Sequence, residues 1–306
     1  MPVNLSAIRD LLLPGLMSVE GQYKTWPTRW SKVFSTRRSK MAFERNVQMR
    51  YLGTAQVKEE GAQSFMDNNA GERWMYVQEH FEVSLGYAMT SKAIEDNLYE
   101  TSFKPSNLGL QRSFAITKEL FGAAVFNNGQ TAGSSGISGG DGVALFSTAH
   151  PVDTGTWANT PVNQVDLSET ALLNASITVN STFVDEAGLL ADVHVDRLMI
   201  PPALEPVAAR LLKAELRPGT NNNDPNVIPI VAGGISNYIV NPYLTSNFAW
   251  FVMTDAEESF LYLERIPFET SMWVDNSTDN LMVKGRERYS FGYRDPRGAY
   301  ASYPTS

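Results

Sequence analysis

The chain has 306 residues, of which 43 % are hydrophobic and 19 % charged, a composition typical of a folded protein with a sizeable core. It contains no cysteine, which excludes disulfides, a thiol nucleophile and a cysteine-based metal site. No apolar run approaches the roughly eighteen residues of a membrane span, and Arg9 and Asp10 interrupt any signal peptide, so we expect synthesis in the cytoplasm and no membrane association.

Charge is distributed unevenly along the chain. Residues 1–50 hold nine basic and three acidic residues, a net charge of +6, against −8 for the whole chain, so the remainder carries −14. A basic segment on an acidic body can pair with a neighbour's acidic surface or contact nucleic acid. The acidic total favours the protein contact, because a nucleic-acid-binding protein is usually basic overall. A solvated surface segment fits the pattern equally well.

The first predicted elements are an extended arm over residues 1–42 and two long segments of alternating polarity. Residues 47–57 and 73–89 both alternate with period two, the pattern of half-buried strands. A single strand over 73–89 would be about 55 Å long, against a usual length of about 17–20 Å. A compact domain cannot bury such an arm. The pattern therefore predicts a hairpin, with a polar tip near 58–73, that leaves its own domain and lies on a neighbouring subunit.

Helices are predicted next. Thr90 or Ser91 caps a short helix, and Ser106 or Asn107 begins a long amphipathic helix that ends at residue 127. A glycine- and serine-rich loop over 129–142 follows, then a helix from 166–169 past 183, a buried strand over 197–200 and a helix from Pro202. The buried stripe of the long helix is expected to contain Leu110, Phe114, Thr117, Phe121 and Ala124.

The last third of the sequence is rich in strands. Helices come first and mostly antiparallel strands later, which is typical of an α+β fold. The predicted strands are 227–231, 238–240, 249–253, 260–265, 271–274 and 281–293.

Sequence motifs for chemistry are weak. Residues 136–140 (GISGG) match the nucleophile elbow of serine hydrolases, but the elbow needs a strand before the serine and a helix after it. Here a glycine-rich loop surrounds Ser138, so a serine hydrolase is only a remote alternative. His80, His150 and His194 lack the spacing of a metal site, and no metal or cofactor is predicted. We expect His150, before Pro151, to fix a turn.

Residues 141–151 (DGVALFSTAHP) resemble the major capsid proteins of tailed bacteriophages, in particular the Mu-like head-subunit group. Residues 198–208 (LMIPPALEPVA) and 250–255 (WFVMTD) extend the resemblance in the same order, and it covers about residues 40–300. The resemblance implies the Hong Kong 97 type fold, whose extended hairpin is called the E-loop. It divides the chain into an N-terminal arm (1–42), the E-loop (43–88), a peripheral domain with a long spine helix (89–189 and 268–306) and an axial domain (190–267).

The resemblance also implies a structural role without catalysis. Such proteins form hexamers and pentamers that close an icosahedral shell around double-stranded DNA in the virion, and an encapsulin-type nanocompartment shell is the alternative within the same fold. Expected partners are other copies of the chain, a portal, non-specifically packaged DNA and, as a further candidate, a decoration protein. Because the first long strand begins by residue 43, we expect a separate scaffolding protein rather than a fused one.

Contacts between subunits are expected from the arm and the hairpin. Lys58 is the lysine nearest the hairpin tip, where the type member of the fold carries a cross-linking lysine, with Asn276 or Asn280 as acceptors by position. No feature demands a covalent bond, so we expect non-covalent clasping. The candidate contact residues are Trp26, Trp30, Arg37, Arg38 and Lys40 in the arm and Lys58, Trp74, Met75, Val77 and Phe81 in the hairpin.

Overall fold

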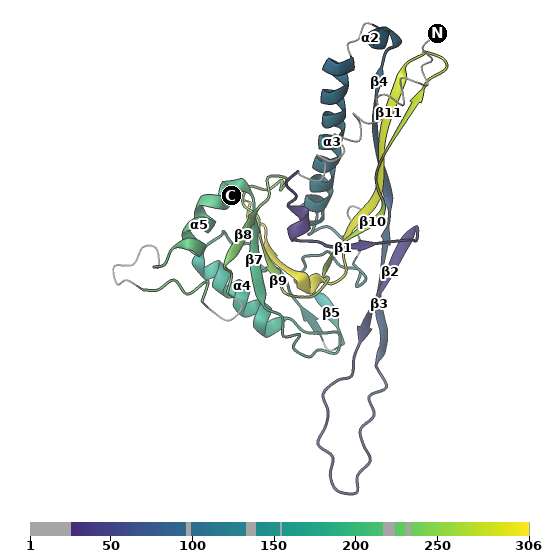
Figure 1. The fold of residues 1–306 in the computed structure, drawn as a ribbon. Helices are drawn as coiled ribbons and strands as arrows, with labels where there is room; N and C mark the ends of the chain where they lie inside the picture. Colours follow the sequence, from purple (N-terminus) through teal and green to yellow (C-terminus); the bar gives the residue numbers. More distant parts are fainter. Residues whose placement is uncertain are drawn as a thin grey trace.

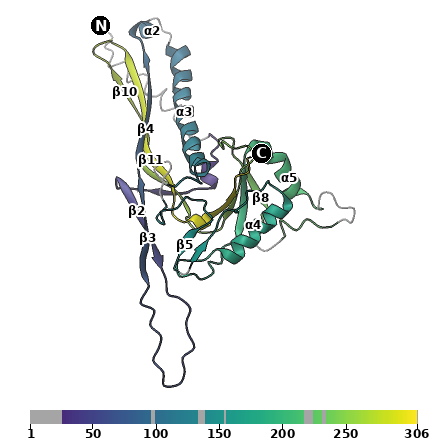
Figure 2. The same cartoon turned by 180° about the vertical axis from the view of Figure 1, so that it is seen from behind.

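The molecule is elongated. A computed structural model describes residues 26–95, 99–132, 139–153, 155–216, 224–230 and 234–305. A long helix lies beside a long, narrow sheet, a rounded part holds a second sheet with two helices, and a hairpin extends away from both (Figures 1 and 2). The C-terminus lies in the rounded part (Figure 1).

The narrow sheet has the strand order β1-β10-β11-β4. Its strands are antiparallel except for β1, which runs parallel to β10. The helix α3 (Tyr99–Asn127) covers one face, where Leu110 and Phe114 pack against Val283 of the sheet. The strands are β1 (Ser35–Arg38), β4 (Phe81–Met89), β10 (Phe260–Val274) and β11 (Leu281–Tyr293).

The second sheet has the order β12-β9-β7-β8 and is covered by α4 and α5. The apolar faces of both helices pack against the sheet through Leu172, Val179 and Leu212. Ser168 caps α4 by accepting a hydrogen bond of 3.2 Å from the Ala171 N–H, as the sequence predicts. The elements are β7 (Val195–Ile200), β8 (Asn237–Val240), β9 (Trp250–Thr254), β12 (Ala299–Ser302), α4 (Glu169–Thr182) and α5 (Glu205–Lys213).

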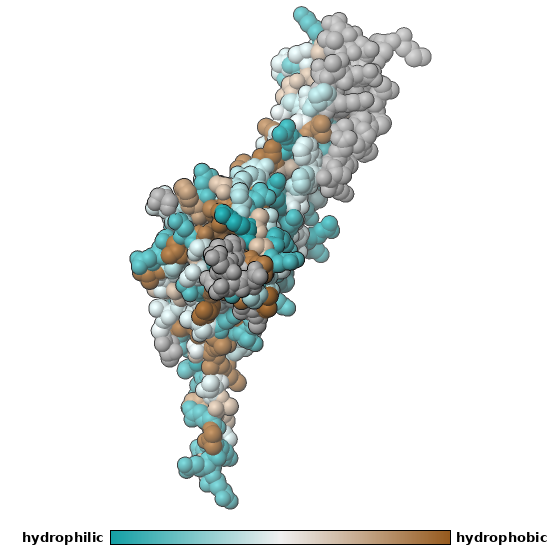
Figure 3. Space-filling view, turned by 90° about the vertical axis from the view of Figure 1, so that its left-hand side faces the viewer, coloured by the Kyte–Doolittle hydropathy of each residue, from teal (hydrophilic) through white to brown (hydrophobic). Residues whose placement is uncertain are grey.

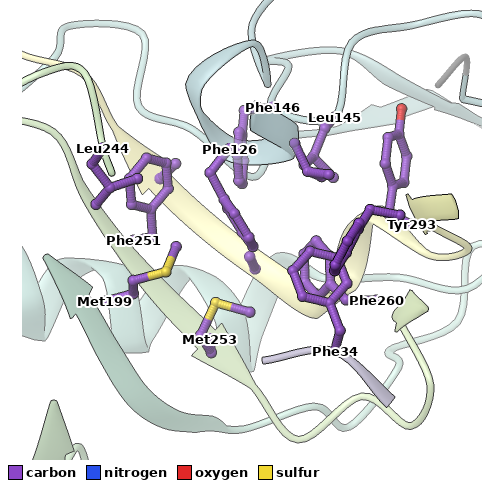
Figure 4. Close-up of a cluster of buried hydrophobic side chains, with 14 of the residues drawn as sticks. Phe34, Phe126, Leu145, Phe146, Met199, Leu244, Phe251, Met253, Phe260 and Tyr293 are labelled. Atoms are coloured by element: carbon purple, nitrogen blue, oxygen red, sulfur yellow. The ribbon is translucent and has the colours of Figure 1, made fainter. Parts of the chain in front are cut away.

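A core of aromatic side chains joins the two sheets at the end of α3 (Figure 4). The ring of Phe126 lies 6.0 Å from that of Phe34, 5.4 Å from Phe251 and 5.1 Å from Phe260, mostly in edge-to-face or tilted arrangements. These rings come from the helix, the N-terminal segment and both sheets. The narrow sheet and the rounded part therefore form one packed body.

The hairpin consists of β2 (Phe43–Arg50) and β3 (Gly71–Glu79), which pair only with each other among the described strands. Residues 51–70 extend beyond both strands (Figure 1). The shorter elements are η1 (Trp30–Lys32), α2 (Ser91–Glu95), β5 (His150–Val152), β6 (Gly155–Trp157), η3 (Pro202–Leu204) and η4 (Pro296–Gly298).

The prediction of one strand over residues 73–89 is wrong. The chain leaves β3 at Glu79 and enters β4 at Phe81, because β3 pairs with β2 whereas β4 pairs with β11. His80 lies between them, buried, and its backbone N–H donates to the Ala42 carbonyl at 3.3 Å. The inward face also differs between the two strands. Even-numbered Tyr76 and Gln78 are buried in β3, whereas odd-numbered Met89 is buried in β4. The first predicted strand, 47–57, is shifted as well and ends at Arg50.

The long helix differs from its prediction in two ways. It begins at Tyr99, so Pro105 lies in its second turn, where the helix lacks the hydrogen bond that an N–H at this position would donate. Its buried stripe contains Leu110 and Phe114 as predicted, but continues through Lys118 instead of Phe121, which is 39 % exposed.

Three predictions for the second half of the chain also need correction. No strand forms over 227–231, because residues 228–230 make a turn, and residue 231 lies outside the described residues. The separate strands 260–265 and 271–274 are one strand, β10, with irregular pairing near Ile266. The expected domain boundary at 267/268 therefore falls inside β10, and β12 lies in the sheet of the rounded part.

Candidate assembly surfaces

The hairpin is the most exposed part of the described chain. In Figure 3 it projects as a narrow extension with apolar patches partway along it and a mostly polar end. Val57 is 99 % exposed and Met66 76 %. A large apolar side chain gains free energy when it leaves water, so such a set is typical of a surface that another molecule covers. The large exposed apolar side chains of the hairpin are Phe43, Met49, Tyr51, Leu52, Val57, Phe65, Met66, Met75 and Val77.

A cluster of charges, the root cluster, joins the hairpin to the body. It comprises Arg50, Arg73, Asp153, Glu186 and Arg297. Arg50 of β2 and Arg73 of β3 both form ion pairs with the carboxylate of Asp153, which follows β5. The side chains of the two arginines are 11 % and 18 % exposed, so water screens these pairs less than it does surface pairs. One carboxylate thus holds both strands of the hairpin.

Glu186 extends the root cluster into the body. Its Oε2 accepts a hydrogen bond of 3.0 Å from the Trp74 indole, and its Oε1 one of 2.9 Å from Arg297. The guanidinium of Arg297 also lies 5.2 Å from the Trp157 ring centre and donates to the Val184 carbonyl at 2.6 Å. The buried arginine is fully satisfied, as burial of a charge requires.

The loop formed by residues 139–150 supports β3 from the other side. A Cβ atom on Gly140 would lie 3.0 Å from the Trp74 Cβ, so any larger residue would require the hairpin or the loop to shift by a few tenths of an ångström. His150 Nδ1 lies 2.7 Å from Asp141 Oδ2 and its Nε2 lies 3.1 Å from Asn159 Oδ1. The buried imidazole thereby ties both ends of the loop together. Its ring hydrogen bonds are as predicted, but His150 itself is the first residue of β5 and not part of a turn.

Asn159 orients the imidazole of His150. Its Nδ2 donates to the carbonyls of Leu145 and Pro296 at 2.7 and 3.1 Å, so its Oδ1 must face the histidine. The His150 ring also stacks on Trp157 at 4.7 Å. The histidine in the run 141–151 is therefore a structural residue of a loop that packs against the hairpin.

The predicted arm residues lie against their own subunit. The Trp30 ring packs 4.4 Å from Tyr262, and Trp26 lies half-buried with the Arg112 guanidinium 5.9 Å from its ring centre. Arg37 forms an ion pair with Glu258. The remaining basic residues, Arg38 and Lys40, are exposed, and Arg38 lies 3.4 Å from Glu264. Arm residues 1–25 lie outside the described residues.

The predicted hairpin residues divide into two groups. Lys58, Met75 and Val77 are exposed. Phe81 packs 4.5 Å from Phe121 of α3 in its own subunit, and the Trp74 indole is hydrogen-bonded to Glu186. The structure therefore leaves Lys58, Met75 and Val77 free for contact with another molecule.

Sequence reasoning missed the root cluster and a second buried ion pair. Lys118 of α3 pairs with Glu287 of β11. Charged residues at helical or alternating positions usually face water, so the pattern alone could not identify these residues. Its position four residues after Phe114, in line with Leu110 and Phe114, was the available signal for Lys118.

Three features that the sequence raises are a metal site, a membrane span and the serine of the hydrolase alternative, and the first two can be checked against the described residues. No three histidine, aspartate or glutamate side chains among them come together in a way that could hold a metal ion. Within the same ranges, none of the helices is both long and apolar enough to cross a membrane. Ser138, the serine of the hydrolase alternative, lies outside the described residues.

A protein-family model described as "Phage capsid protein" matches residues 108–302, more than half of the chain. The chain belongs to the phage capsid protein family. This capsid protein is a structural component of the virion, and its function is to form the shell of the phage head. Family membership assigns it a structural role instead of the hydrolase activity, and favours the phage function over the nanocompartment alternative.

Solved structures of capsids share its fold. The capsid of a native GTA particle matches with a TM-score of 0.57 at 11 % identity, covering 92 % of both chains. The capsid of cyanophage P-SCSP1u matches with 0.57 at 11 % identity over 92 % of this chain and 89 % of that one. The virus-like particle from Pyrococcus furiosus gives 0.54 at 10 % identity over 94 % and 97 %. None of the curated proteins matches the sequence.

At these low identities the structural matches show the fold alone. The predicted α+β capsid fold of the Hong Kong 97 type is confirmed. The narrow sheet with α3, the rounded part and the projecting hairpin are its components here (Figure 1).

Proposed function

We propose that this capsid protein forms hexamers and pentamers that close an icosahedral shell around double-stranded DNA, and that each hairpin lies across a neighbouring subunit. One observation carries the second part of the proposal. Met75 and Val77 point away from the body on β3 and are 51 % and 39 % exposed, whereas Tyr76 and Gln78 between them are buried. A strand with one face on its own body and an apolar outer face has a surface for a second copy.

We divide the capsid protein for assembly by its two sheets. The rounded part with β7, β8, β9 and β12 would lie at the centre of a capsomer, as the axial domain. The narrow sheet with α3 would form the peripheral domain. The whole of β10 pairs within the narrow sheet, so this division places Phe260–Val274 in the peripheral domain.

The arm is a second candidate contact. Arg38 and Lys40 remain exposed, and residues 51–306 carry a net charge of −14. We propose that the basic arm meets an acidic surface of a neighbouring subunit, since opposite charges steer association. Packaged DNA would then be held without specific contacts by a shell of net negative charge.

The sequence motifs also support a proposal about the subgroup of capsid proteins and about assembly partners. The run 141–151 supports placement within the Mu-like head-subunit group. We further propose that assembly uses a portal and a separately encoded scaffolding protein, with a decoration protein as an additional partner.

Substitution of the outer face of β3 tests the proposed contact. A Met75→Ser/Val77→Ser double variant should leave the subunit folded, because both side chains are exposed, but should lower the yield of closed shells. Electron microscopy of the purified particles and sedimentation measure that yield. Ile177→Ser, on α4 and 62 % exposed, is the matched control and should assemble normally. Normal assembly of the double variant would contradict the contact.

A further inference from the structure

The outer edge of β4 is the least protected strand edge in the described chain. β4 pairs with β11 on one side, and no described strand pairs with the other side. It has nine residues in unbroken register, no proline and only one charged residue, Glu82. Proteins normally protect an exposed edge with charges, prolines, bulges or short length, because its unpaired N–H and C=O groups bind other strands.

The other edge strands show these protective features. β1 at the opposite edge of the same sheet has four residues, two of them arginines. β8 and β12 also have four residues each, while β2 and β3 carry three charged residues each. β4 lacks such charges, prolines and short length, which suits an edge that another strand covers in the assembled shell.

Apolar side chains beside the outer edge of β4 also favour its coverage by another strand. Ser84, Leu85 and Gly86 at the centre of β4 are all exposed, and Leu85 is 47 % exposed. Phe121 of α3, also partly exposed, contacts Phe81 at the end of the strand. A strand added here would gain both main-chain hydrogen bonds and apolar contacts.

The hairpin tip also has backbone groups without hydrogen-bond partners. Residues 51–58 are extended but belong to no strand, and within the described part of the chain the backbone N–H groups of residues 54–58 donate to no backbone carbonyl. The side chains alternate, with Tyr51, Ala55 and Val57 on one face. The Tyr51 carbonyl and the Gly53 N–H already have partners within the hairpin, so residues 54–58 offer the unsatisfied groups. The eight-residue run is close in length to the nine-residue edge of β4.

A subunit cannot make this pairing with itself. The tip and β4 lie toward opposite ends of the molecule, with β3 between them (Figures 1 and 2). We infer that residues 51–58 of one copy add as a strand to the edge of β4, which no described strand covers, in a second copy. The inference rests on the proposed placement of the hairpin on a neighbour and names the surface that receives it; the addition of a strand to a sheet edge is an established mode of recognition.

Disulfide cross-linking tests the pairing, because the natural chain has no cysteine. Ser84→Cys is combined in turn with a cysteine at Thr54, Ala55, Gln56 or Val57, and the assembled shells are oxidised. At least one pair should give a ladder of linked subunits on a denaturing gel without reductant. Ser84→Cys with Asp192→Cys, whose side chain is 88 % exposed in the rounded part, is the control and should give no ladder. Dimers from Ser84→Cys alone would show that β4 pairs with β4 and would overturn the inference.

Amide hydrogen exchange provides an independent measurement. Amides on the outer edge of residues 82–88 should exchange roughly tenfold or more slowly in shells than in free subunits. A variant with residues 54–66 replaced by a glycine-serine linker of equal length should fold normally and lose this protection. If the Met75→Ser/Val77→Ser variant fails to assemble while no cross-link or protection appears in natural shells, only the β4 assignment is wrong. If that variant also assembles normally, both proposals are wrong.

Discussion

Lys118 Nζ lies 2.7 Å from Glu287 Oε2, and this ion pair joins α3 to β11 with both side chains at least nine-tenths buried. The ammonium also lies 5.7 and 5.4 Å from the ring centres of Tyr262 and Tyr289. The pair therefore fixes the helix on the sheet at one position.

We expect Lys118→Met to lower the free energy of unfolding by about 3–5 kcal/mol, because it removes the ammonium group that lies against the buried Glu287 carboxylate. Denaturant unfolding of the isolated subunit measures the change. The double variant Lys118→Met/Glu287→Leu should recover much of the loss, since it removes both charges. Arg286→Met is the control on the same strand; its pair with Glu269 is exposed, and the expected loss is below about 1 kcal/mol. Equal losses for Lys118→Met and Arg286→Met would contradict this account.

The His150 imidazole should contribute to stability although it takes part in no chemistry. His150→Ala removes the contacts with Asp141 and Asn159 and leaves polar groups buried without partners, so we expect a loss of about 1–3 kcal/mol. Thermal unfolding measures it, with His194→Ala as the control because that side chain is 40 % exposed. A change no larger than that of the control would show that the loop holds its shape without the histidine.

The carboxylate of Asp153 should keep the ends of β2 and β3 ordered where the hairpin joins the body. Asp153→Asn weakens its pairing with both Arg50 and Arg73, and amides at the ends of β2 and β3 should then exchange faster while those of β9 do not change. Added salt should have a smaller effect on the variant than on the natural protein, since the screened charge is gone. Asp192→Asn is the exposed control. Unchanged exchange at the root would mean that the root cluster does not hold the hairpin.

Acid should destabilise the subunit through His80. Burial lowers the pKa of His80 below its ordinary value of 6.5, Arg288 and Arg265 add to this shift, and Glu44 opposes it. Because the unfolded chain binds the proton more readily, the stability that His80 contributes is full above about pH 6.5 and falls as the pH drops below it. Unfolding measured between pH 7.5 and pH 5 should show this fall. His80→Gln should reduce it, and an identical pH dependence in the variant would assign the fall to other groups.

Alternating polarity predicted the strands of the hairpin and of β4 correctly as strands, but not where they separate. The break at His80 depends on a change of partner, from β2 to β11, and partners distant in sequence leave no local signal. For the same reason the side chains expected on one contact face do not all point outward. Met75 and Val77 face outward, whereas Phe81 packs against its own helix.

The motif at 141–151 indicated the family, but the sequence did not show what these residues do in the fold. In the folded chain Asp141 and His150, nine residues apart, close a loop on the hairpin root. Asp153 and Glu186 could not be found from the sequence, because an acidic residue in a loop has no pattern until the two arginines that it binds are placed beside it.

The exposure of residues 51–70 has a consequence for the fidelity of shell formation. In the proposed docking the conformational freedom of these residues would be lost, so the cost would fall on each association step and reduce the net strength of each contact. Weak individual contacts let a misplaced subunit dissociate before its neighbours enclose it. Only a subunit held on several sides stays, and the growing shell can correct its own errors.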